Sequence, residues 1–312
     1  MEVKVSNIAF SKNSYLVEEL LKEFPDAEVN KDGNRFQGQE LVKYFDGAEG
    51  VIVGLESITG PFLDQLPNLK IIAKFGVGLD NIDIEACEVR NVRLGWTGGV
   101  NKVSVAEMSL GFMLALRRNL YSTSNDLKGL VWNKSGGFQL SGCTIGIIGM
   151  GNIGKELVRL LEPFQCRILF SDIVRMDGFA EENGLTQVSK EELLSSSDIV
   201  SLHVPFTKDT SNLINLEVLK KMKNTSFLIN TARGGIVNEQ ELKYALRNSI
   251  IGGAALDVYE IEPPSDKELL TLPNLICTPH TGGNSYEAVV AMGLSAIKHL
   301  VHYRDHHFIK QS

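Results

Sequence analysis

Residues 144–154 read Thr144-Ile145-Gly146-Ile147-Ile148-Gly149-Met150-Gly151-Asn152-Ile153-Gly154, and this stretch sets the architecture of the whole chain. An apolar run typical of a buried strand is followed by a glycine-rich turn and a helix-like segment. In such a unit, backbone N–H groups at the helix N-terminus bind a pyrophosphate. Gly149 permits the tight turn, Gly151 permits close approach of the ligand, and Gly154 permits packing of the helix on the strand. The pattern therefore predicts a dinucleotide site.

An acidic residue follows at the distance that this site needs. A second apolar run, Ile168-Leu169-Phe170, ends at Asp172, 18 residues beyond Gly154. A carboxylate there accepts hydrogen bonds from both ribose hydroxyls of an adenosine and repels a 2′-phosphate, which favours NAD over NADP. Arg175 lies close enough in sequence to weaken that argument. A glycine-rich turn alone occurs in many α/β proteins, but the flanking strands, the helix and the acid together favour dinucleotide binding.

The composition is that of a globular protein that is long enough for two domains. Of its 312 residues, 43% are hydrophobic and 22% are charged. The net charge of -7 counts against a nucleic-acid partner. Four cysteines without a CxxC pair predict buried thiols in a reducing compartment, with no metal or disulfide framework. We find no charged leader and no apolar segment that could span a bilayer, so we expect a cytoplasmic protein without a membrane partner.

Strand-like and helix-like segments alternate along the chain, which predicts parallel sheets covered by helices. Strands are expected at 3–6, 27–29, 50–53, 69–74, 92–94, 144–148, 168–170, 199–203, 227–230, 253–257 and 275–278. We therefore predict an α/β protein with two doubly wound parallel-sheet domains. Residues 1–98 and 285–312 would form a flavodoxin-like substrate-binding domain, and residues 99–284 a Rossmann NAD-binding domain.

Two segments between the expected domains differ from this alternation. Residues 104–120 form a helix so apolar that we expect it to be buried at a domain or subunit interface. Residues 128–142 are rich in glycine and polar residues but contain Trp132 and Phe138. They are interpreted as an irregular arm with apolar anchors.

Three polar residues lie just beyond the carboxyl ends of strands expected in the second half, where open α/β sheets bind their ligands. A nicotinamide enzyme that oxidises a hydroxy acid needs a base for the hydroxyl proton, and His280 is the candidate. Glu262 would fix the tautomer of that imidazole, and Arg233 would hold the substrate carboxylate through two bonds. Each residue also has a purely structural explanation. Arg233 could neutralise a helix end, Glu262 could be a solvated acid in a loop, and His280 could be a hydrogen-bonded histidine in a turn.

At this point the chain resembles the D-isomer-specific 2-hydroxyacid dehydrogenases, a family that includes D-3-phosphoglycerate dehydrogenase. The resemblance covers nearly the whole chain and is carried by the dinucleotide turn and six further motifs. These are Phe75-Gly76-Val77-Gly78-Leu79-Asp80-Asn81-Ile82-Asp83, Asn101 with Ser104-Val105-Ala106-Glu107, Leu202-His203-Val204-Pro205, Asn230-Thr231-Ala232-Arg233-Gly234, Asp257-Val258-Tyr259 with Glu262-Pro263, and Thr278-Pro279-His280-Thr281-Gly282-Gly283.

The resemblance implies that Arg233, Glu262 and His280 are the catalytic trio. It also implies that Asp257 bonds the nicotinamide amide and that amides near Val77 hold the substrate carboxylate. The residues expected to contact NAD are Gly149, Gly151, Asn152, Ile153, Gly154, Asp172, His203, Val204, Pro205, Thr231, Ala232, Arg233, Asp257, His280 and Gly282. The residues expected to contact the substrate are Leu55, Glu56, Lys74, Gly76, Val77, Gly78, Asn101, Arg233 and His280. A homodimer through the NAD-binding domain is implied as well.

Departures from the family pattern bear on the substrate. Phosphoglycerate dehydrogenases of the family hold the phosphate with a basic residue near the start of a loop that here reads Gly54-Leu55-Glu56-Ser57. Lys74 or Lys102 could supply positive charge instead. Met108 stands where many relatives have histidine. Because the chain ends at Ser312, we do not expect the regulatory domain of the long phosphoglycerate dehydrogenases.

The resulting prediction is an NAD-dependent dehydrogenase of small D-2-hydroxy acids. D-3-phosphoglycerate is the first choice of substrate, followed by glyoxylate, hydroxypyruvate or another 2-oxo acid. The alternative outside enzymes is a corepressor-like protein that binds NAD as a signal, and the retained trio favours the enzyme. His302 and His306, one helical turn apart, match a metal pair. A solvated C-terminus is the preferred interpretation, so no metal is expected.

Overall fold

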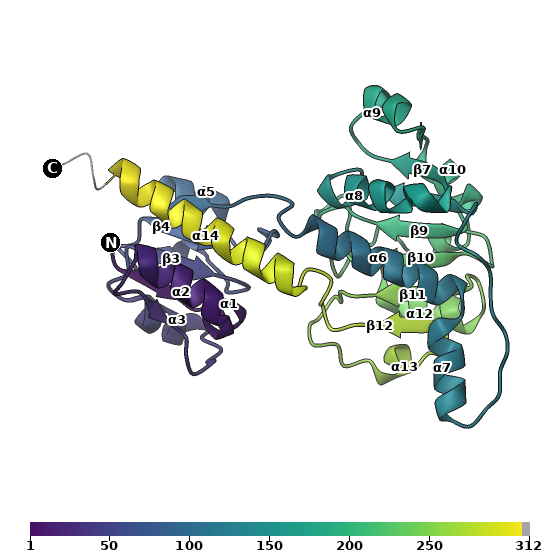
Figure 1. Cartoon of the computed structure of the whole chain (residues 1–312), viewed down its shortest axis with the longest axis horizontal. Helices are drawn as coiled ribbons and strands as arrows, with labels where there is room; N and C mark the ends of the chain where they lie inside the picture. Colours follow the sequence, from purple (N-terminus) through teal and green to yellow (C-terminus); the bar gives the residue numbers. More distant parts are fainter. Residues whose placement is uncertain (308–312) are drawn as a thin grey trace. The chain divides into compact units, whose positions relative to one another are not determined.

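The computed structural model describes residues 1–307 (Figure 1). The chain divides into two compact units. Unit 1 contains Met1–Asn101 and the chain from Asn284 onward, and unit 2 contains Lys102–Gly283. Each unit has its own parallel sheet with apolar clusters on both faces. The predicted α/β class with two doubly wound sheets is therefore confirmed.

Unit 1 is built on a five-stranded sheet in the order β2-β1-β3-β4-β5. Its strands, all paired in parallel, are β1 (Val3–Val5), β2 (Glu28–Val29), β3 (Gly50–Val53), β4 (Ile71–Lys74) and β5 (Arg93–Gly95). This order is that of flavodoxin-like sheets. The loops after the strands therefore meet along one edge.

Alternation along the strands divides the core of unit 1 between the two faces of its sheet. Val51 and Val53 pack with α3 (Gly38–Phe45), α4 (Gly60–Leu63) and α5 (Ile84–Val89). Ile52 points the other way, to α1 (Ile8–Lys12), α2 (Ser14–Glu23) and α14 (Tyr286–His307). Successive strand residues face opposite sides of a sheet, so a continuous apolar run requires helices on both.

Unit 2 is built on seven parallel strands in the order β12-β11-β10-β9-β6-β7-β8. They are β6 (Thr144–Ile148), β7 (Arg167–Ser171), β8 (Thr186–Gln187), β9 (Ile199–Leu202), β10 (Phe227–Asn230), β11 (Gly253–Leu256) and β12 (Leu275–Cys277). From β6 the chain moves outward through β7 and β8, and then returns to β9 on the other side. Ligands bind beyond the carboxyl ends of the strands where the order reverses, which here is between β6 and β9.

Helices cover both faces of this second sheet. One cluster joins α6 (Lys102–Arg117), α8 (Asn152–Leu161) and α9 (Asp177–Glu182) to the strands. The other joins α10 (Lys190–Ser196), α11 (Leu216–Leu219), α12 (Glu239–Arg247) and α13 (Lys267–Leu270). A short 3-10 turn, Glu162–Phe164, follows α8. None of the helices in residues 1–307 combines the length and apolar character needed to cross a bilayer.

The structure corrects the prediction around residue 120. The helix expected at 104–120 ends at Arg117, and a second helix, α7 (Leu120–Lys128), starts after Asn119. Asn119 has a φ of 51°, a left-handed conformation that interrupts the helical path and that asparagine tolerates. Sequence reasoning missed α7 because no residue of this helix is buried, which leaves no apolar periodicity to detect.

Three further expectations hold only in part. The apolar face of α6 packs within unit 2, where Phe112, Met113 and Leu116 join the cluster beneath α8. Of the four free cysteines, Cys87 and Cys143 are buried, whereas Cys166 and Cys277 are half-buried. The chain is irregular from Gly129 to Gly142, as predicted, whereas Lys128 belongs to α7. The expected anchors, Trp132 and Phe138, are exposed in the described structure.

Candidate active site

The glycine-rich turn after β6 has the geometry that its three glycines predict. Gly149 has a φ of 95°, and a Cβ there would lie 2.6 Å from the backbone oxygen of His203. A Cβ on Gly154 would collide with the backbone oxygen of Gly149. A Cβ on Gly151 would meet nothing within 4 Å, so the space in front of this residue is open. Because Gly151 also caps α8 without a side-chain bond, the N-terminus of the helix is open to a ligand.

Asp172 lies beside this turn, at the end of β7. Its Oδ2 accepts a hydrogen bond from the backbone N–H of Met150 (2.7 Å), and its Oδ1 accepts one from Val174 (2.9 Å). The carboxylate is therefore held next to the turn. Arg175, which could have favoured NADP, is paired with Asp177 at 2.8 Å.

His203, at the end of β9, completes the edge where the strand order reverses. Its backbone N–H donates to the oxygen of Ile148 (2.8 Å), and its Nε2 lies 2.9 Å from Ser201 Oγ. The other ring nitrogen, Nδ1, is buried and has no hydrogen-bond partner. Burial lowers the pKa of His203 to about 4, so the ring is neutral at physiological pH. Val204 lies against Gly149.

Arg233 is presented by a turn at the end of β10. The side chain of Asn230 holds the turn closed: its Oδ1 accepts from Ala232 N–H (3.1 Å), and its Nδ2 donates to Arg233 O (2.9 Å). Thr231 is buried, and its hydroxyl lies 2.9 Å from that of Ser109 on α6. Sequence reasoning placed Asn230 in a family motif without a role and did not identify Ser109. Asparagine directly before a turn is the signal that could have indicated the first of them.

His280 and Glu262, which are 18 positions apart in the chain, are in direct contact. Nδ1 of His280 lies 2.8 Å from Glu262 Oε2, and Glu262 Oε1 accepts a hydrogen bond from the backbone N–H of Tyr259 (3.1 Å). The side chains are 40% and 35% exposed, so both remain accessible. A carboxylate at Nδ1 fixes that nitrogen as the donor and leaves Nε2 as the atom that exchanges a proton.

Asp257 anchors the loop that carries His280. This buried carboxylate accepts hydrogen bonds from Thr278 Oγ1 (2.6 Å), Thr281 N–H (2.8 Å) and Gly282 N–H (2.7 Å). Its backbone oxygen accepts a bond from His280 N–H (2.8 Å), whose φ is 54°. The structure thus shows a positioning role that the sequence did not suggest. A bond from Asp257 to a nicotinamide amide stays a prediction.

The three catalytic candidates lie at the ends of neighbouring strands. β10 pairs with β11, and β11 pairs with β12. Arg233 follows β10, the segment from Asp257 to Glu262 follows β11, and His280 follows β12. The sheet therefore brings to one edge three residues that the sequence separates by up to 47 positions. Contacts of His280 and Arg233 with the substrate and with the cofactor stay predictions.

In unit 1, the loops after β3 and β4 are tied together by Lys74. Its buried Nζ donates to Gly54 O and to Asn81 Oδ1 (2.7 Å), and Asn81 Nδ2 donates to Glu56 O (2.5 Å). The carboxylate of Glu56 accepts from Gly54 N–H (2.5 Å). Leu55 is 83% exposed at the tip. Lys74 thus stabilises its own loops from inside, a use that sequence reasoning did not foresee.

The glycine loop and Asn101 complete the predicted substrate residues of unit 1. Gly76 has a φ of 135°, which explains why glycine is needed there. Val77 O accepts a hydrogen bond from Trp96 Nε1 (2.8 Å), and Gly78 is half-buried beside it. Asn101 has a buried Oδ1 without a hydrogen-bond partner. These residues stay predictions as substrate contacts.

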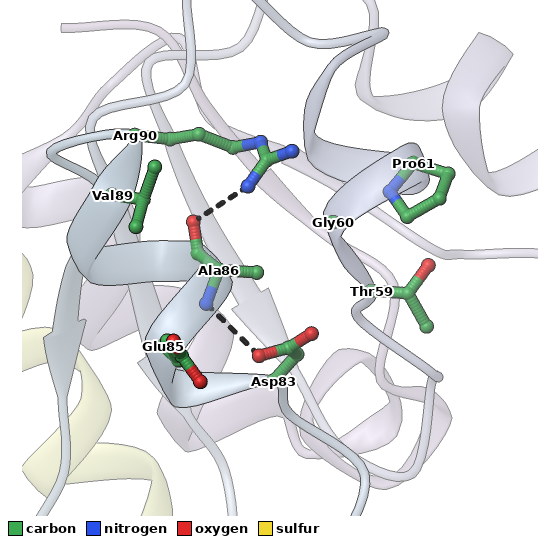
Figure 2. A pocket seen from close by; sticks show the side chains of 8 residues that line it. All are labelled: Thr59, Gly60, Pro61, Asp83, Glu85, Ala86, Val89 and Arg90. Carbon is green, nitrogen blue, oxygen red and sulfur yellow. Dashed lines mark hydrogen bonds between the residues drawn. The ribbon is translucent and has the colours of Figure 1, made fainter.

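Two other features of residues 1–307 are not assigned a binding role. A cavity of about 330 Å³ between α4 and α5 is lined by Thr59, Gly60, Pro61, Asp83, Glu85, Ala86, Val89 and Arg90 (Figure 2). Two of its polar side chains are used internally, since Asp83 caps α5 and Arg90 bonds Ala86 O (3.1 Å) and Asp64 (2.7 Å). The rings of His302 and His306 are 4.0 Å apart, and residues 1–307 contain no group of three potential metal ligands.

Comparison with known proteins identifies the family. Residues 110–282 match the family model described as "D-isomer specific 2-hydroxyacid dehydrogenase, NAD binding domain". A hydroxypyruvate reductase of Thermotoga maritima is 34% identical over 277 residues, 87% of this chain and 90% of that protein. A D-3-phosphoglycerate dehydrogenase of Methanocaldococcus jannaschii is 37% identical over 259 residues, which cover 82% of this chain but 49% of that protein.

A solved structure agrees with both the fold and the cofactor. The D-lactate dehydrogenase of Aquifex aeolicus, complexed with NAD and lactic acid, is 25% identical with a TM-score of 0.84 and covers 100% of this chain and 97% of its own. In the present chain, the open space at Gly151, the free N-terminus of α8 and the carboxylate of Asp172 fit NAD. The chain therefore belongs to the D-isomer-specific 2-hydroxyacid dehydrogenases, which oxidise CH–OH groups with NAD.

Proposed function

We propose that the protein interconverts a small, unphosphorylated D-2-hydroxy acid and its 2-oxo acid, with glyoxylate and hydroxypyruvate as the first candidates. The observation that carries the activity is the contact of 2.8 Å between His280 Nδ1 and Glu262 Oε2 at the carboxyl end of the sheet of unit 2. A histidine with a carboxylate on one nitrogen and an accessible ring is the acid–base group that hydroxy-acid oxidation requires.

The chemistry divides between the cofactor and three side chains. Bound NAD supplies the nicotinamide that accepts or donates the hydride. Nε2 of His280 takes the hydroxyl proton during oxidation and returns it to the carbonyl oxygen during reduction. Glu262 stabilises the imidazolium that forms while the ring holds this proton. Arg233 binds the substrate carboxylate and polarises the adjacent carbonyl.

The choice of substrate rests on the charges of the loops after β3 and β4. Residues 54–59 and 75–83 contain Glu56, Asp80 and Asp83 but no lysine, arginine or histidine. The buried ammonium of Lys74 is bonded to Gly54 and Asn81 inside these loops. Lys102, the other cation considered, is paired with Glu156 at 3.3 Å. Within these two loops a dianionic phosphate would therefore meet no available cation, whereas a short uncharged tail would meet Leu55. These observations favour an unphosphorylated acid over D-3-phosphoglycerate, the first choice from sequence.

The test is a panel of 2-oxo acids assayed by NADH consumption. Glyoxylate, hydroxypyruvate, pyruvate and 3-phosphohydroxypyruvate are compared by kcat/KM, with the variant His280→Ala as the inactive control. We expect glyoxylate or hydroxypyruvate to exceed the phosphorylated acid by at least about tenfold, the effect of one unpaired charge. A preference for 3-phosphohydroxypyruvate would refute the substrate assignment. Binding of NADH without turnover of any acid would refute the enzyme itself and favour a binding protein.

We also propose that unit 2 forms a homodimer through α7 and the arm at 128–142. Leu130, Trp132 and Phe138 are 92%, 78% and 62% exposed. Leu120 and Leu127 on α7 are 54% and 56% exposed. Such a concentration of large apolar side chains marks an interaction surface. Substrate binding by unit 1 belongs to the same proposal and rests on the Gly76–Gly78 loop after β4.

A further inference from the structure

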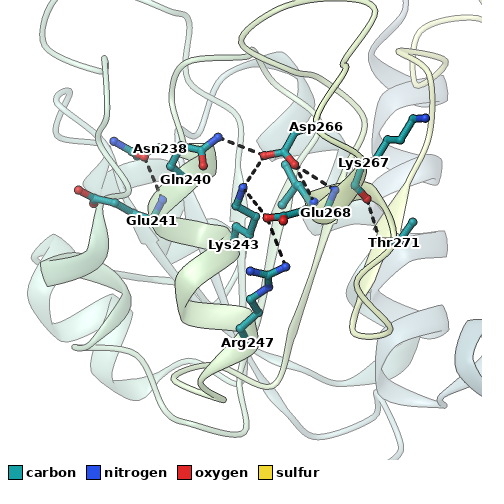
Figure 3. A network of polar contacts seen from close by, with 10 residues as sticks. Asn238, Gln240, Glu241, Lys243, Arg247, Asp266, Lys267, Glu268 and Thr271 are labelled. Carbon is teal, nitrogen blue, oxygen red and sulfur yellow. Dashed lines mark hydrogen bonds and ion pairs between the residues drawn. The ribbon is translucent and has the colours of Figure 1, made fainter.

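The segment that carries Glu262 is attached at both ends to one helix, α12. At its far end, Asp266 Oδ2 accepts hydrogen bonds from Lys243 Nζ (2.7 Å) and Gln240 Nε2 (3.1 Å), and Asp266 Oδ1 caps α13 (Figure 3). The hydrogen bond from Lys243 lowers the pKa of Asp266 to about 2. Asp266 is therefore ionised at all physiological pH values, so this attachment does not depend on pH in that range.

At the near end, the attachment is made by Glu239, the first residue of α12. Its Oε1 accepts a hydrogen bond of 2.5 Å from the backbone N–H of Glu260. Glu260 is two residues before Glu262, and its neighbour Tyr259 donates its own N–H to Glu262. Glu239 is half-buried, and this burial raises its pKa. A carboxylate that remains partly desolvated beside other acids is costly unless it makes such a bond.

The same helix starts six residues after Arg233, so it connects two catalytic segments. The turn from Arg233 to Asn238 leads directly into Glu239. Within that turn, Gly234 packs so closely on the backbone of Tyr259 that any Cβ would collide with it. The loop of Glu262 thus rests on the Arg233 turn and is held to α12 by Glu239. A shift of this helix would move Glu262 relative to His280.

We propose that Glu239 is a positioning residue for catalysis, which holds Glu262 against His280 through the backbone of Glu260. This inference rests on the proposed function, in which the Glu262–His280 pair exchanges the proton. Glu239 touches neither member of that pair in the hydrogen bonds described above. Its effect is therefore transmitted through the loop. Without the hydrogen bond between Glu239 and Glu260, Glu262 can move away from His280.

The kinetic test compares Glu239→Ala with Glu239→Gln. The alanine variant removes the acceptor, whereas glutamine keeps an oxygen at the same place. We expect Glu239→Ala to lower kcat by about tenfold, a typical effect of one hydrogen bond to a charged group. The glutamine variant should keep kcat within about threefold of wild type, because a neutral acceptor retains part of the bond. NADH affinity should change in neither variant, because the hydrogen bond of Glu239 is made to Glu260 and not to the glycine turn after β6.

The matched control is Lys220→Met at the C-cap of α11, which breaks an exposed ion pair of 2.7 Å with Glu217 in the same unit. It should leave all kinetic constants unchanged. Thermal unfolding of each variant establishes that it folds. If Glu239→Ala folds and keeps the wild-type kcat, or if glutamine behaves like alanine, the hydrogen bond does not position Glu262 and the inference is wrong.

A double-mutant cycle with Glu262→Gln separates positioning from a general loss of stability. If Glu239 acts through Glu262, adding Glu239→Ala to Glu262→Gln should cause less than a further twofold loss of kcat. Independent effects would instead multiply, and this result would overturn the proposal.

A readout that needs no turnover tests the inference separately from the proposed function. The titration of the His280 ring is followed by NMR in wild type and in the three variants of the cycle. Glu239→Ala should move the midpoint in the same direction as Glu262→Gln, and it should cause no further movement in the Glu262→Gln background. If the wild type reduces no 2-oxo acid, this titration still decides whether Glu239 positions Glu262. An unmoved midpoint in Glu239→Ala would reject it.

Discussion

Acid sensitivity that depends on His203 is the most direct prediction of the structure. The buried Nδ1 of this ring has no partner, and burial lowers its pKa from 6.5 to about 4. Protonation would therefore place a charge and an unpaired N–H group inside unit 2. Because the pKa is lower in the folded state, the unfolded chain binds the proton more tightly. The associated stability is complete above pH 6.5 and is lost as the pH falls towards about 4.

The size of this effect follows from the two pKa values. For a group that titrates at 6.5 in the unfolded chain and at about 4 in the folded chain, linkage gives a loss of about 2 kcal/mol at about pH 5. The residue as a whole is half-buried, so solvent screening makes this an upper value. His203→Gln removes the titrating group and keeps an amide that can still bond Ser201.

The assay is denaturant unfolding of the wild type and the variant at about pH 7.5 and about pH 5. We expect the difference in the free energy of unfolding between the two proteins to change by 1–2 kcal/mol between these pH values, about the amount worked out above. His306→Gln, at an exposed position near the end of α14, is the control and should show no such change. If wild type and His203→Gln lose stability in parallel, the buried Nδ1 does not govern the response to acid.

The remaining predictions concern the catalytic base, the cofactor and the dimer. His280→Ala should lower kcat by about 10²–10⁴-fold, while NADH affinity, measured by fluorescence titration, stays nearly intact. Normal turnover of this variant would contradict the base assignment. Asp172→Ala should weaken NAD binding more than NADP binding, by roughly tenfold, and equal losses in calorimetry would argue against its contact with the ribose. Gly154→Ala should destabilise unit 2 by about 1–3 kcal/mol, because the new Cβ collides with Gly149, and unchanged thermal unfolding would show that the turn adapts. Trp132→Asp should shift the protein towards monomer in light scattering, and an unaltered mass would exclude the arm from the interface.

The local pattern of residues predicted most of the architecture. Apolar strands of four or five residues, glycines at three fixed positions and an acid 18 residues later are short-range signals, and each of them acts through the backbone of its own segment. For this reason the dinucleotide turn, Asp172 and the strand ends that carry Arg233, Glu262 and His280 could be identified without coordinates. Where the local signal was weak, as in the exposed helix α7 after Asn119, the prediction was wrong.

Tertiary contacts supplied what no spacing encodes. The three bonds that Asp257 makes to the His280 loop and the support of Glu260 by Glu239 join residues 21 to 25 positions apart. The internal use of Lys74 was equally invisible, because its rotamer depends on the loop after β3, 20 residues away. Local pattern determines which segments become strands and turns. Packing of the sheet determines which side chains meet, because hydrogen bonds and burial depend on distance in space and not on distance along the chain.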